Sequence, residues 1–259
     1  MSKISFMFLR RYLQAALAAW LCLCFSGTAR ADKLIVSAAA SLARAFKEIG
    51  ETFEQAQPEA KVVFNFAASG PLLQQIERGA PVDVLATADQ ETMDQAAARK
   101  LIKPISRRAF ALNRLALIVP QQDSGRIKSV DDLKQGFVKR IAIGVPASAP
   151  VGRYTRDALQ AASAWEALAP KFINAESVRQ ILDYVSRGEV DAGFVYITDA
   201  WDAADRVRTV TEFASRKPVE YPIAVVATTR SPRLAETFVA HVLSPQGRAI
   251  LAKHRFGNP

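Results

Sequence analysis

Short apolar runs alternate along the chain with longer segments in which apolar residues recur at helical spacing. Leu34 to Val36 form one such run, and Leu42, Phe46 and Ile49 follow it at intervals of four and three positions. The first pattern is typical of a buried strand and the second of an amphipathic helix. The alternation predicts strands at residues 34–36, 62–66, 82–85, 111–119, 141–144, 192–196 and 219–227, and helices at residues 42–49, 72–77, 90–98, 152–162, 177–186, 232–243 and 246–253.

This order of strands and helices predicts an α/β fold built from parallel β-α-β units. Ligands of such folds bind at the carboxyl ends of the strands, where the N-termini of the following helices converge. No low-complexity tract or linker rich in proline, glycine and serine interrupts the pattern. A division into two lobes must therefore use short crossovers within ordered structure.

Four of the strand-to-helix junctions carry groups that can donate hydrogen bonds. Ser41 and Ser69 each follow a strand and precede a helix, and Ser41 stands where a helix N-cap is expected. Residues 150–152 and 176–178 begin two later helices and bring the backbone N–H groups of Val151 and Val178, and the next strand ends at Tyr196. Free N–H groups and the positive end of a helix dipole favour an anion at such places.

Each of these residues also has an ordinary structural explanation. Serine is among the commonest helix caps, valine packs readily at a helix start, and Tyr196 alone would suit a core aromatic. Arg44, Arg153 and Arg179 lie near the donors in the sequence, but helix periodicity predicts that they face solvent. An anion site is favoured by the recurrence of donors in a chain without the signature of a nucleophile, a metal cluster or a basic pocket.

Seven segments of the chain form a recognisable set: AAASL at 38–42, FAASG at 66–70, GAPVDVLATAD at 79–89, PVGRY at 150–154, AESVRQIL at 175–182, GFVYITDA at 193–200 and VEYPIAVV at 219–226. Together they resemble the periplasmic molybdate-binding proteins of ABC transporters. The similarity runs over nearly the whole chain after residue 31 and keeps one order. It implies a two-lobe class II periplasmic binding protein fold with a ligand cleft between the lobes, in which residues 32–112 plus 221–259 form lobe 1 and residues 113–220 form lobe 2.

The resemblance also implies a ligand set. Ser41 and Ser69 would donate from one lobe, Val151 and Val178 would donate backbone N–H groups from the other, and Tyr196 would donate its hydroxyl. Relatives often carry alanine at the position of Val151, whose extra methyl groups could narrow the pocket. These residues would hold molybdenum only as its oxyanion, without a direct metal ligand and without a cofactor.

The function implied is high-affinity binding of molybdate, and of tungstate, and delivery to an ABC importer rather than catalysis. The partners would be an inner-membrane permease and its cytoplasmic ATPase, and the binding protein would act as a monomer. Tyr221 and Pro222, assigned to the second crossover, are the candidate hinge.

Molybdate suits a site made of donors because its oxygens only accept hydrogen bonds. Phosphate keeps a proton near neutral pH, which such a site leaves unpaired at a cost of about 1–3 kcal/mol. Sulfate has no proton, and a sulfate-binding protein stays an alternative because the pocket volume cannot be derived from sequence. The alternative of another class is an exported α/β hydrolase with Ser41 or Ser69 as nucleophile, for which only His241 and His254 could serve as the base.

The first 31 residues have the features of an export signal. Basic residues precede an apolar run at residues 12–25, and Ala29 and Ala31 fit the rule of small residues at a cleavage site. We expect a signal peptide at residues 1–31, cleaved after Ala31, and a periplasmic protein. Cleavage removes four basic residues, so that the formal net charge falls from +9 to +5, and it also removes both cysteines, Cys22 and Cys24.

The composition that remains excludes several classes of protein. A chain without cysteine can form no disulfide, thiolate metal site or cysteine nucleophile. Nucleic acid is not expected as a partner, because no run of Lys and Arg with interleaved aromatic residues is present.

Overall fold

The computed structural model describes residues 32–213 and 218–259. The expected signal peptide, with Cys22 and Cys24, lies outside the described residues. Within the described ranges, no helix combines the length and the apolar character needed to cross a membrane.

The first of two five-stranded sheets has the strand order β2-β1-β3-β10-β4. Strands β1 and β3 run parallel, whereas β10 runs antiparallel to both β3 and β4. The strands are β1 (Asp32–Ala39), β2 (Ala60–Ala67), β3 (Val84–Ala86), β4 (Arg108–Asn113) and β10 (Val219–Val225).

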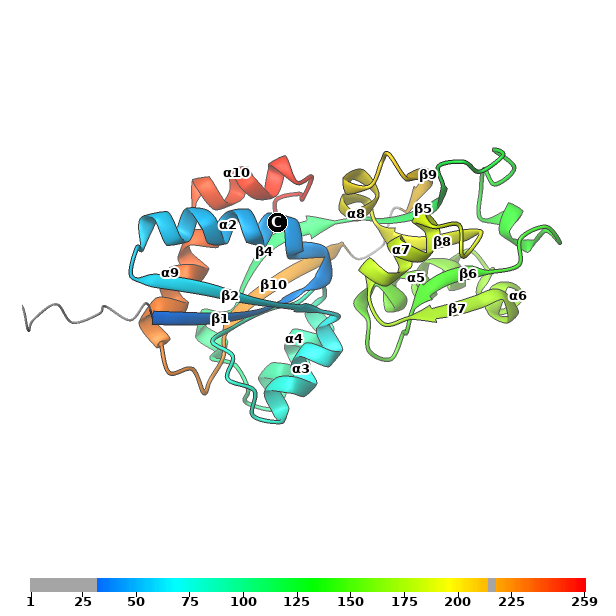
Figure 1. Cartoon of the computed structure of the whole chain (residues 1–259). Coiled ribbons are helices and arrows are strands. Elements are labelled where there is room, and N and C mark those ends of the chain that lie inside the picture. The colour runs from blue at the N-terminus through cyan, green and yellow to red at the C-terminus, as the bar shows by residue number, and fades with distance from the viewer. Residues whose placement is uncertain (1–31, 214–217) are drawn as a thin grey trace, which may run out of the picture. The chain divides into compact units, whose positions relative to one another are not determined.

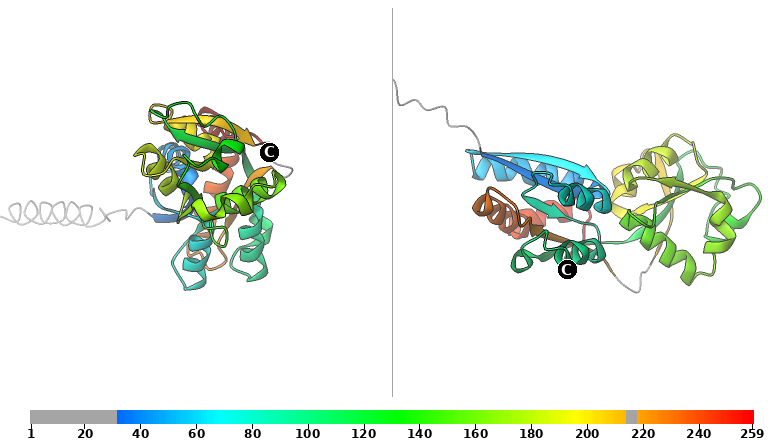
Figure 2. Two further views of the ribbon diagram at one scale, coloured as in Figure 1. Left: turned by 90° about the vertical axis from the view of Figure 1, so that its right-hand side faces the viewer. Right: turned by 90° about the horizontal axis from the view of Figure 1, so that it is seen from below.

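Helices cover both faces of this sheet (Figure 1, Figure 2). Alternate residues of β3 face opposite sides, because Val84 belongs to the larger core cluster and Leu85 to a separate one formed with helices α3 and α4. Helices α2, α9 and α10 contact one another on the other side. The helices are α2 (Ala43–Ala56), α3 (Ser69–Glu77), α4 (Gln90–Ala98), α9 (Pro232–Leu243) and α10 (Pro245–Lys253).

The second sheet has the order β7-β6-β8-β5-β9. Strand β6 runs parallel to β7 and β8, and β5 runs antiparallel to β8 and β9. Its strands are β5 (Leu115–Pro120), β6 (Ile141–Gly144), β7 (Phe172–Ala175), β8 (Ala192–Tyr196) and β9 (Val207–Phe213), and its helices are α5 (Pro150–Ala161), α6 (Trp165–Leu168), α7 (Val178–Ser186) and α8 (Ile197–Asp202). Short 3-10 helices complete the fold: η1 (Ala40–Leu42), η2 (Pro104–Ser106), η3 (Asp131–Lys134) and η4 (Ala169–Lys171).

The predicted α/β class with two lobes is confirmed, and we call each sheet with the helices that pack on it a lobe. The chain passes from the first sheet to the second at Arg114, and it returns between Phe213 and Val219. The boundaries proposed for the lobes stay a prediction. The expected parallel pairs are present in both sheets, and each sheet combines them with antiparallel pairs, which the sequence did not predict.

Two local predictions were also wrong. The strand expected at residues 111–119 is two strands, β4 and β5, which belong to different sheets. The break falls at Arg114, whose backbone N–H donates to the Asn113 side chain over 2.9 Å. Tyr221 and Pro222 do not lie in the second crossover, because both are inside β10, where its pairing with β4 shifts register.

Candidate functional site

A small cavity brings together all five residues that the sequence nominated. Its volume is about 10 Å³, which is about the room that one water molecule needs. Both lobes contribute to its wall, because the starts of η1 and α3 come from the first lobe and the starts of α5 and α7 from the second. It is lined by Ala39, Ala40, Ser41, Ala68, Ser69, Ala88, Ala149, Pro150, Val151, Val178 and Tyr196.

The helix starts at this cavity hold backbone N–H groups without intrahelical acceptors, since the first turn of a helix has none. Three of the four N-cap residues are alanines, Ala39, Ala68 and Ala149, and in the described part of the chain none of them makes a side-chain cap hydrogen bond. The fourth helix, α7, is capped by Ser177, which accepts from the Gln180 N–H over 3.4 Å. The N–H groups of Val151 and Val178, both in first turns, are therefore placed to serve a ligand.

Ser41 is not the helix cap that its position in the sequence suggested. It is the second residue of η1, and the N-cap of α2 is Leu42. Because residues 40–42 form a 3-10 turn before the α-helix begins, the serine lies one residue before the N-cap of α2 and its side chain is free for other bonds. Its hydroxyl oxygen lies 3.0 Å from the Tyr221 hydroxyl oxygen.

Ser69 is the first residue of α3 and is fully buried. Its Oγ accepts a hydrogen bond from the Ala88 N–H over 3.0 Å. Accepting this bond leaves the hydroxyl proton of Ser69 to be donated elsewhere. The next residue joins the lobes, since the Gly70 N–H donates to the Ser148 carbonyl oxygen over 3.0 Å.

The buried hydroxyl of Tyr196 is the feature of this cavity that points most specifically to a ligand. Its side chain is 1% exposed, and its hydroxyl has no hydrogen-bond partner among the residues that the structure describes. Leaving a buried hydroxyl unpaired costs about 1–3 kcal/mol. Burial also raises the pKa of this hydroxyl well above its ordinary value, so that it keeps its proton and can donate.

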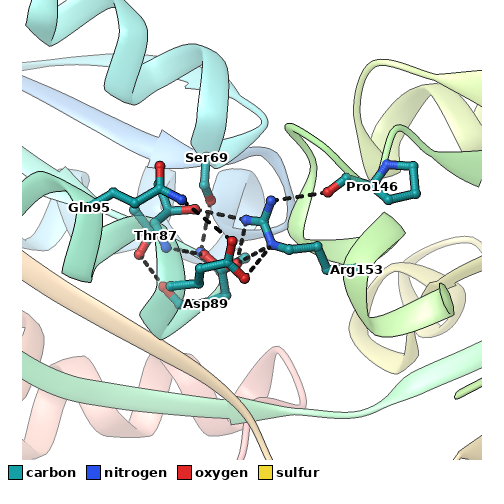
Figure 3. Close-up of polar contacts among 9 residues, drawn as sticks. Ser69, Thr87, Asp89, Gln95, Pro146 and Arg153 are labelled. Atoms are coloured by element: carbon teal, nitrogen blue, oxygen red, sulfur yellow. Dashed lines mark hydrogen bonds and ion pairs between the residues drawn. The ribbon is translucent and has the colours of Figure 1, made fainter. Parts of the chain in front are cut away.

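A buried ion pair connects the lobes beside the cavity (Figure 3). Arg153, on α5, donates through Nε to Asp89 Oδ2 over 2.9 Å, and its Nη2 contacts the same oxygen. Nη2 also donates to Thr92 Oγ1 over 2.9 Å, and Nη1 donates to the Pro146 carbonyl oxygen over 3.3 Å. Asp89 is at the same time the N-cap of α4, accepting from the Thr92 N–H over 3.2 Å.

The expectation that Arg153 faces solvent was therefore wrong, since the residue is only 8% exposed. Its burial is possible because a carboxylate from the other lobe compensates its charge. For the same reason its charge is already neutralised and is not available to a ligand in the cavity.

The two other arginines near the donors behave differently. Arg44 is largely exposed, with 56% of its side chain accessible, and its Nε lies 3.4 Å from Asp202 Oδ2. Arg179 Nη2 lies 3.8 Å from Asp199 Oδ1. Burial raises the pKa of the Asp199 carboxyl from 3.8 to about 7, although Arg179 acts in the opposite direction.

Sequence reasoning did not nominate Asp89, Asn113, Asp199 or Tyr221 as parts of this region. Asp89 had a local signal, because an aspartate directly before a helix is a typical N-cap. The Asp89 partner Arg153 lies 64 positions away, and the Ser41 partner Tyr221 lies 180 positions away. Such pairings are produced by the fold, and no spacing rule predicts them.

A wider cavity of about 780 Å³ lies elsewhere, with Asn113, Trp201 and Phe256 in its wall. It contains none of the five nominated residues, and it borders Pro218, next to residues that the structure does not describe. The small cavity is therefore the candidate site.

Known proteins resemble the chain over almost its full length. It matches the family model of the bacterial extracellular solute-binding proteins over residues 34–257. It is 36% identical to the molybdate-binding protein ModA of Escherichia coli over 256 residues, which are 95% of this chain and 98% of the relative. It is also 36% identical to ModA of Mycobacterium tuberculosis over 237 residues, which are 90% of this chain and 87% of the relative.

Solved structures share the fold. The periplasmic molybdate-binding protein of Azotobacter vinelandii matches with a TM-score of 0.78 at 23% identity, over 87% of this chain and 99% of that chain. The sulfate-binding protein SubI of Mycobacterium tuberculosis matches with a TM-score of 0.78 at 17% identity, over 88% of this chain and 87% of that chain. The match over residues 34–257, together with relatives at 36% identity, shows that the chain belongs to the family of bacterial extracellular solute-binding proteins.

Proposed function

We propose that this protein binds molybdate in the periplasm and delivers it to an ABC importer. The observation that carries the proposal is the unpaired, buried hydroxyl of Tyr196 in a cavity lined by the uncapped starts of helices. Relatives at 36% identity over most of their length are named molybdate-binding proteins, which supports the choice of ligand.

The chemistry of the wall suits a dianion whose oxygens only accept hydrogen bonds. Among the described residues that line the cavity, none carries a formal charge. The hydroxyls of Ser41, Ser69 and Tyr196 and the N–H groups of Val151 and Val178 would supply five donors. At about 1.5–3 kcal/mol each, such charge-assisted bonds total on the order of 10 kcal/mol before the costs of desolvation and ordering.

Tungstate is proposed as a second ligand, because it has the same tetrahedral form and charge as molybdate. Sulfate is the alternative that the test must separate. The sulfate-binding protein SubI shares the fold, but at 17% identity that likeness supports no choice of ligand. The size of the site in the ligand-bound protein is the property by which the larger oxyanions would be preferred.

A hydrolytic role for either serine has no support in the positions of the histidines. His241 Nε2 lies 2.9 Å from Thr52 Oγ1, and His254 Nε2 lies 2.9 Å from Glu48 Oε2. The hydroxyl of Ser41 bonds to Tyr221 and that of Ser69 to the Ala88 N–H, so that neither is activated by a base.

Delivery to a permease with a cytoplasmic ATPase, a monomeric state and cleavage of residues 1–31 belong to the same proposal. A leader of this kind would carry the chain to the compartment in which family members collect their ligands.

The test is calorimetric titration of the mature protein with sodium molybdate, tungstate, sulfate and phosphate at neutral pH. We expect saturable, one-to-one binding of molybdate and tungstate that is much tighter than the binding of sulfate and phosphate. Ser69→Ala should weaken molybdate binding at least tenfold, whereas Ser124→Ala, at an exposed serine, should leave it unchanged. Binding of sulfate as tight as that of molybdate would contradict the proposal.

A further inference from the structure

Tyr221 lies behind the cavity and does not line it. The residue is fully buried in β10, and aromatic rings hold its own ring on several sides. Their centroids lie 5.5 Å away for Phe256, 6.0 Å for Tyr196 and 6.3 Å for Phe110. Close packing on these sides holds the ring in place, so the position of the Tyr221 hydroxyl, 3.0 Å from Ser41 Oγ, is set by the core.

The orientation of the Asn113 side-chain amide follows from the backbone beside it. Its Oδ1 accepts the Arg114 N–H over 2.9 Å, so the other end of the amide must be the NH₂ group. This NH₂ group lies 2.9 Å from Thr198 Oγ1 and 3.2 Å from Tyr221 Oη. Because an NH₂ group only donates, the Tyr221 oxygen accepts from Asn113.

The direction of the hydrogen bond between Tyr221 and Ser41 follows when their donors and acceptors are counted in the same way. Tyr221 has one proton, and Ser41 Oγ is the remaining neighbour within hydrogen-bond distance in the described structure. If Ser41 donated instead, the buried proton of Tyr221 would have no acceptor, at a cost of about 1–3 kcal/mol. Tyr221 therefore donates to Ser41, and the proton of Ser41 is left for the cavity that Ser41 lines.

We propose that Tyr221 and Asn113 are positioning residues that hold the Ser41 hydroxyl as a donor toward the ligand cavity. The proposal rests on the proposed binding of an oxyanion, and it explains how the site distinguishes oxyanions without a proton from protonated ones. A free serine hydroxyl can donate or accept, so it would tolerate a protonated oxyanion such as hydrogen phosphate. When Tyr221 occupies one of its two acceptor positions and its own proton is directed into the cavity, the Ser41 hydroxyl favours oxyanions without a proton.

The hydrogen bonds from Asn113 through Tyr221 to Ser41 form a series that we call the relay. This relay also explains why a chain of neutral groups suits the wall behind the cavity. Hydrogen bonds in a chain polarise one another, so each donor in the series from Asn113 to Ser41 is strengthened by the one before it. Asn113 is the last residue of β4, directly before the crossover at Arg114, and Thr198 lies on α8 of the other lobe. The relay thus begins where the chain passes between the lobes.

Titration of three variants with molybdate and with phosphate tests the relay. Tyr221→Phe frees the acceptor side of Ser41, and we expect molybdate binding to weaken about tenfold while the ratio of molybdate to phosphate affinity also falls. Asn113→Asp replaces the donor by an acceptor, which would reverse the series and weaken molybdate binding further. Tyr184→Phe is the matched control, because the Tyr184 hydroxyl accepts from Gln180 Nε2 over 2.9 Å, away from the cavity.

A double variant separates positioning from general damage to the fold. If Tyr221 acts through Ser41, Ser41→Ala combined with Tyr221→Phe should bind molybdate as weakly as Ser41→Ala alone. Losses that add independently, or a Tyr221→Phe protein with the affinity and anion ratio of the wild type, would overturn the relay. Thermal unfolding of each ligand-free variant identifies any that fails to fold.

Neutron diffraction of the ligand-free protein gives a readout that needs no ligand. The deuteron between the two hydroxyl oxygens should be bonded to Tyr221 Oη, and a deuteron bonded to Ser41 and directed at Tyr221 would overturn the relay. If the wild type bound no oxyanion, the proposed function would fail while this measurement still decided the direction of the relay.

Discussion

Asp89 caps helix α4 in one lobe and at the same time binds Arg153 of the other, so one carboxylate serves both local and interlobe structure. Breaking a buried ion pair by removing one partner costs about 3–5 kcal/mol, because the other charge is left uncompensated. The pair can form only while the lobes are together. Its loss should therefore weaken ligand binding, in which both lobes take part.

We expect Arg153→Met and Asp89→Asn each to weaken molybdate binding by at least tenfold, and to do so at high as well as low salt. Asparagine can still cap α4, so the second variant isolates the ion pair. In a double-mutant cycle measured by calorimetry, the combined loss should be smaller than the sum of the single losses. Arg156→Met, on the exposed side of the same helix, is the control, and equal losses in it would contradict the role of the pair.

We predict that the position of Gly70 has no room for any side chain. A Cβ at this position would overlap the carbonyl oxygen of Ser148, to which the Gly70 N–H donates. Gly70→Ala should therefore push the lobes apart and weaken molybdate binding, with a small effect on the unfolding temperature of the ligand-free protein. Gly136→Ala, where a Cβ meets nothing within 4 Å, should change neither property.

Tyr196→Phe should separate stability from binding. The variant removes a buried hydroxyl without a partner in the described structure, so the ligand-free protein should unfold at the same temperature as the wild type or a higher one. Molybdate binding should weaken at least tenfold, because a donor to the ligand is lost. Thermal scans with and without molybdate measure both effects, and a variant that loses ligand-free stability would contradict the assignment of this hydroxyl.

The raised pKa of the Asp199 carboxyl predicts that the free energy of unfolding depends on pH. Its carboxyl has a pKa of about 7 in the folded protein and 3.8 as its ordinary value, so the folded state holds the proton more tightly than the unfolded chain. The contribution to stability is present in full below about pH 4 and is lost as the pH rises to about 7. Each unit of pKa difference corresponds to about 1.4 kcal/mol.

Denaturant unfolding at several pH values, comparing the wild type with Asp199→Asn, measures this contribution. The variant should gain stability relative to the wild type as the pH rises from 4 to 7, and the difference should stay constant above that. The comparison is needed because His241 acts in the opposite direction: burial lowers its pKa, so its contribution is lost as the pH falls. Parallel curves for the two proteins would show that Asp199 is ionised throughout.

Local pattern was enough to locate many elements of the fold. The strands at Ile141–Gly144 and Ala192–Tyr196 and the helix at Gln90–Ala98 were predicted with the bounds that the structure has. All three have a regular apolar pattern and are closed by turn residues or caps. The break at Arg114 gave no such signal, because apolar residues continue on both sides of it.

The strands β7 and β9 were missed for a different reason. Both are edge strands of the second sheet and leave several side chains exposed or half exposed, so no continuous apolar run marks them. Their strand conformation is imposed by pairing with β6 and β5, which a local pattern cannot contain.

The candidate site was predictable where backbone at a helix start supplies the donor. Val151 and Val178 were nominated because a strand followed by a helix places such groups at a sheet edge in an α/β fold, and because their segments resemble those of the family; both line the cavity. Arg153 was expected to face solvent and Tyr221 was assigned to the hinge, and the structure places both differently. Their roles depend on partners far along the chain, and Arg153 resembles any solvated helix residue until Asp89 is placed beside it.

The alanines at the starts of η1, α3 and α5 bear on how long the protein survives in the cell. A side-chain cap typically stabilises a helix by about 0.5–2 kcal/mol, and these starts have none in the described structure. An oxyanion bound there would act as the missing cap of all three at once, and it would raise the free energy of unfolding by an amount that grows with the logarithm of the ratio of its concentration to its Kd. If the proposed binding holds, the ligand-free protein would be the form that proteases digest first, and the lifetime of the protein would follow the supply of its ligand.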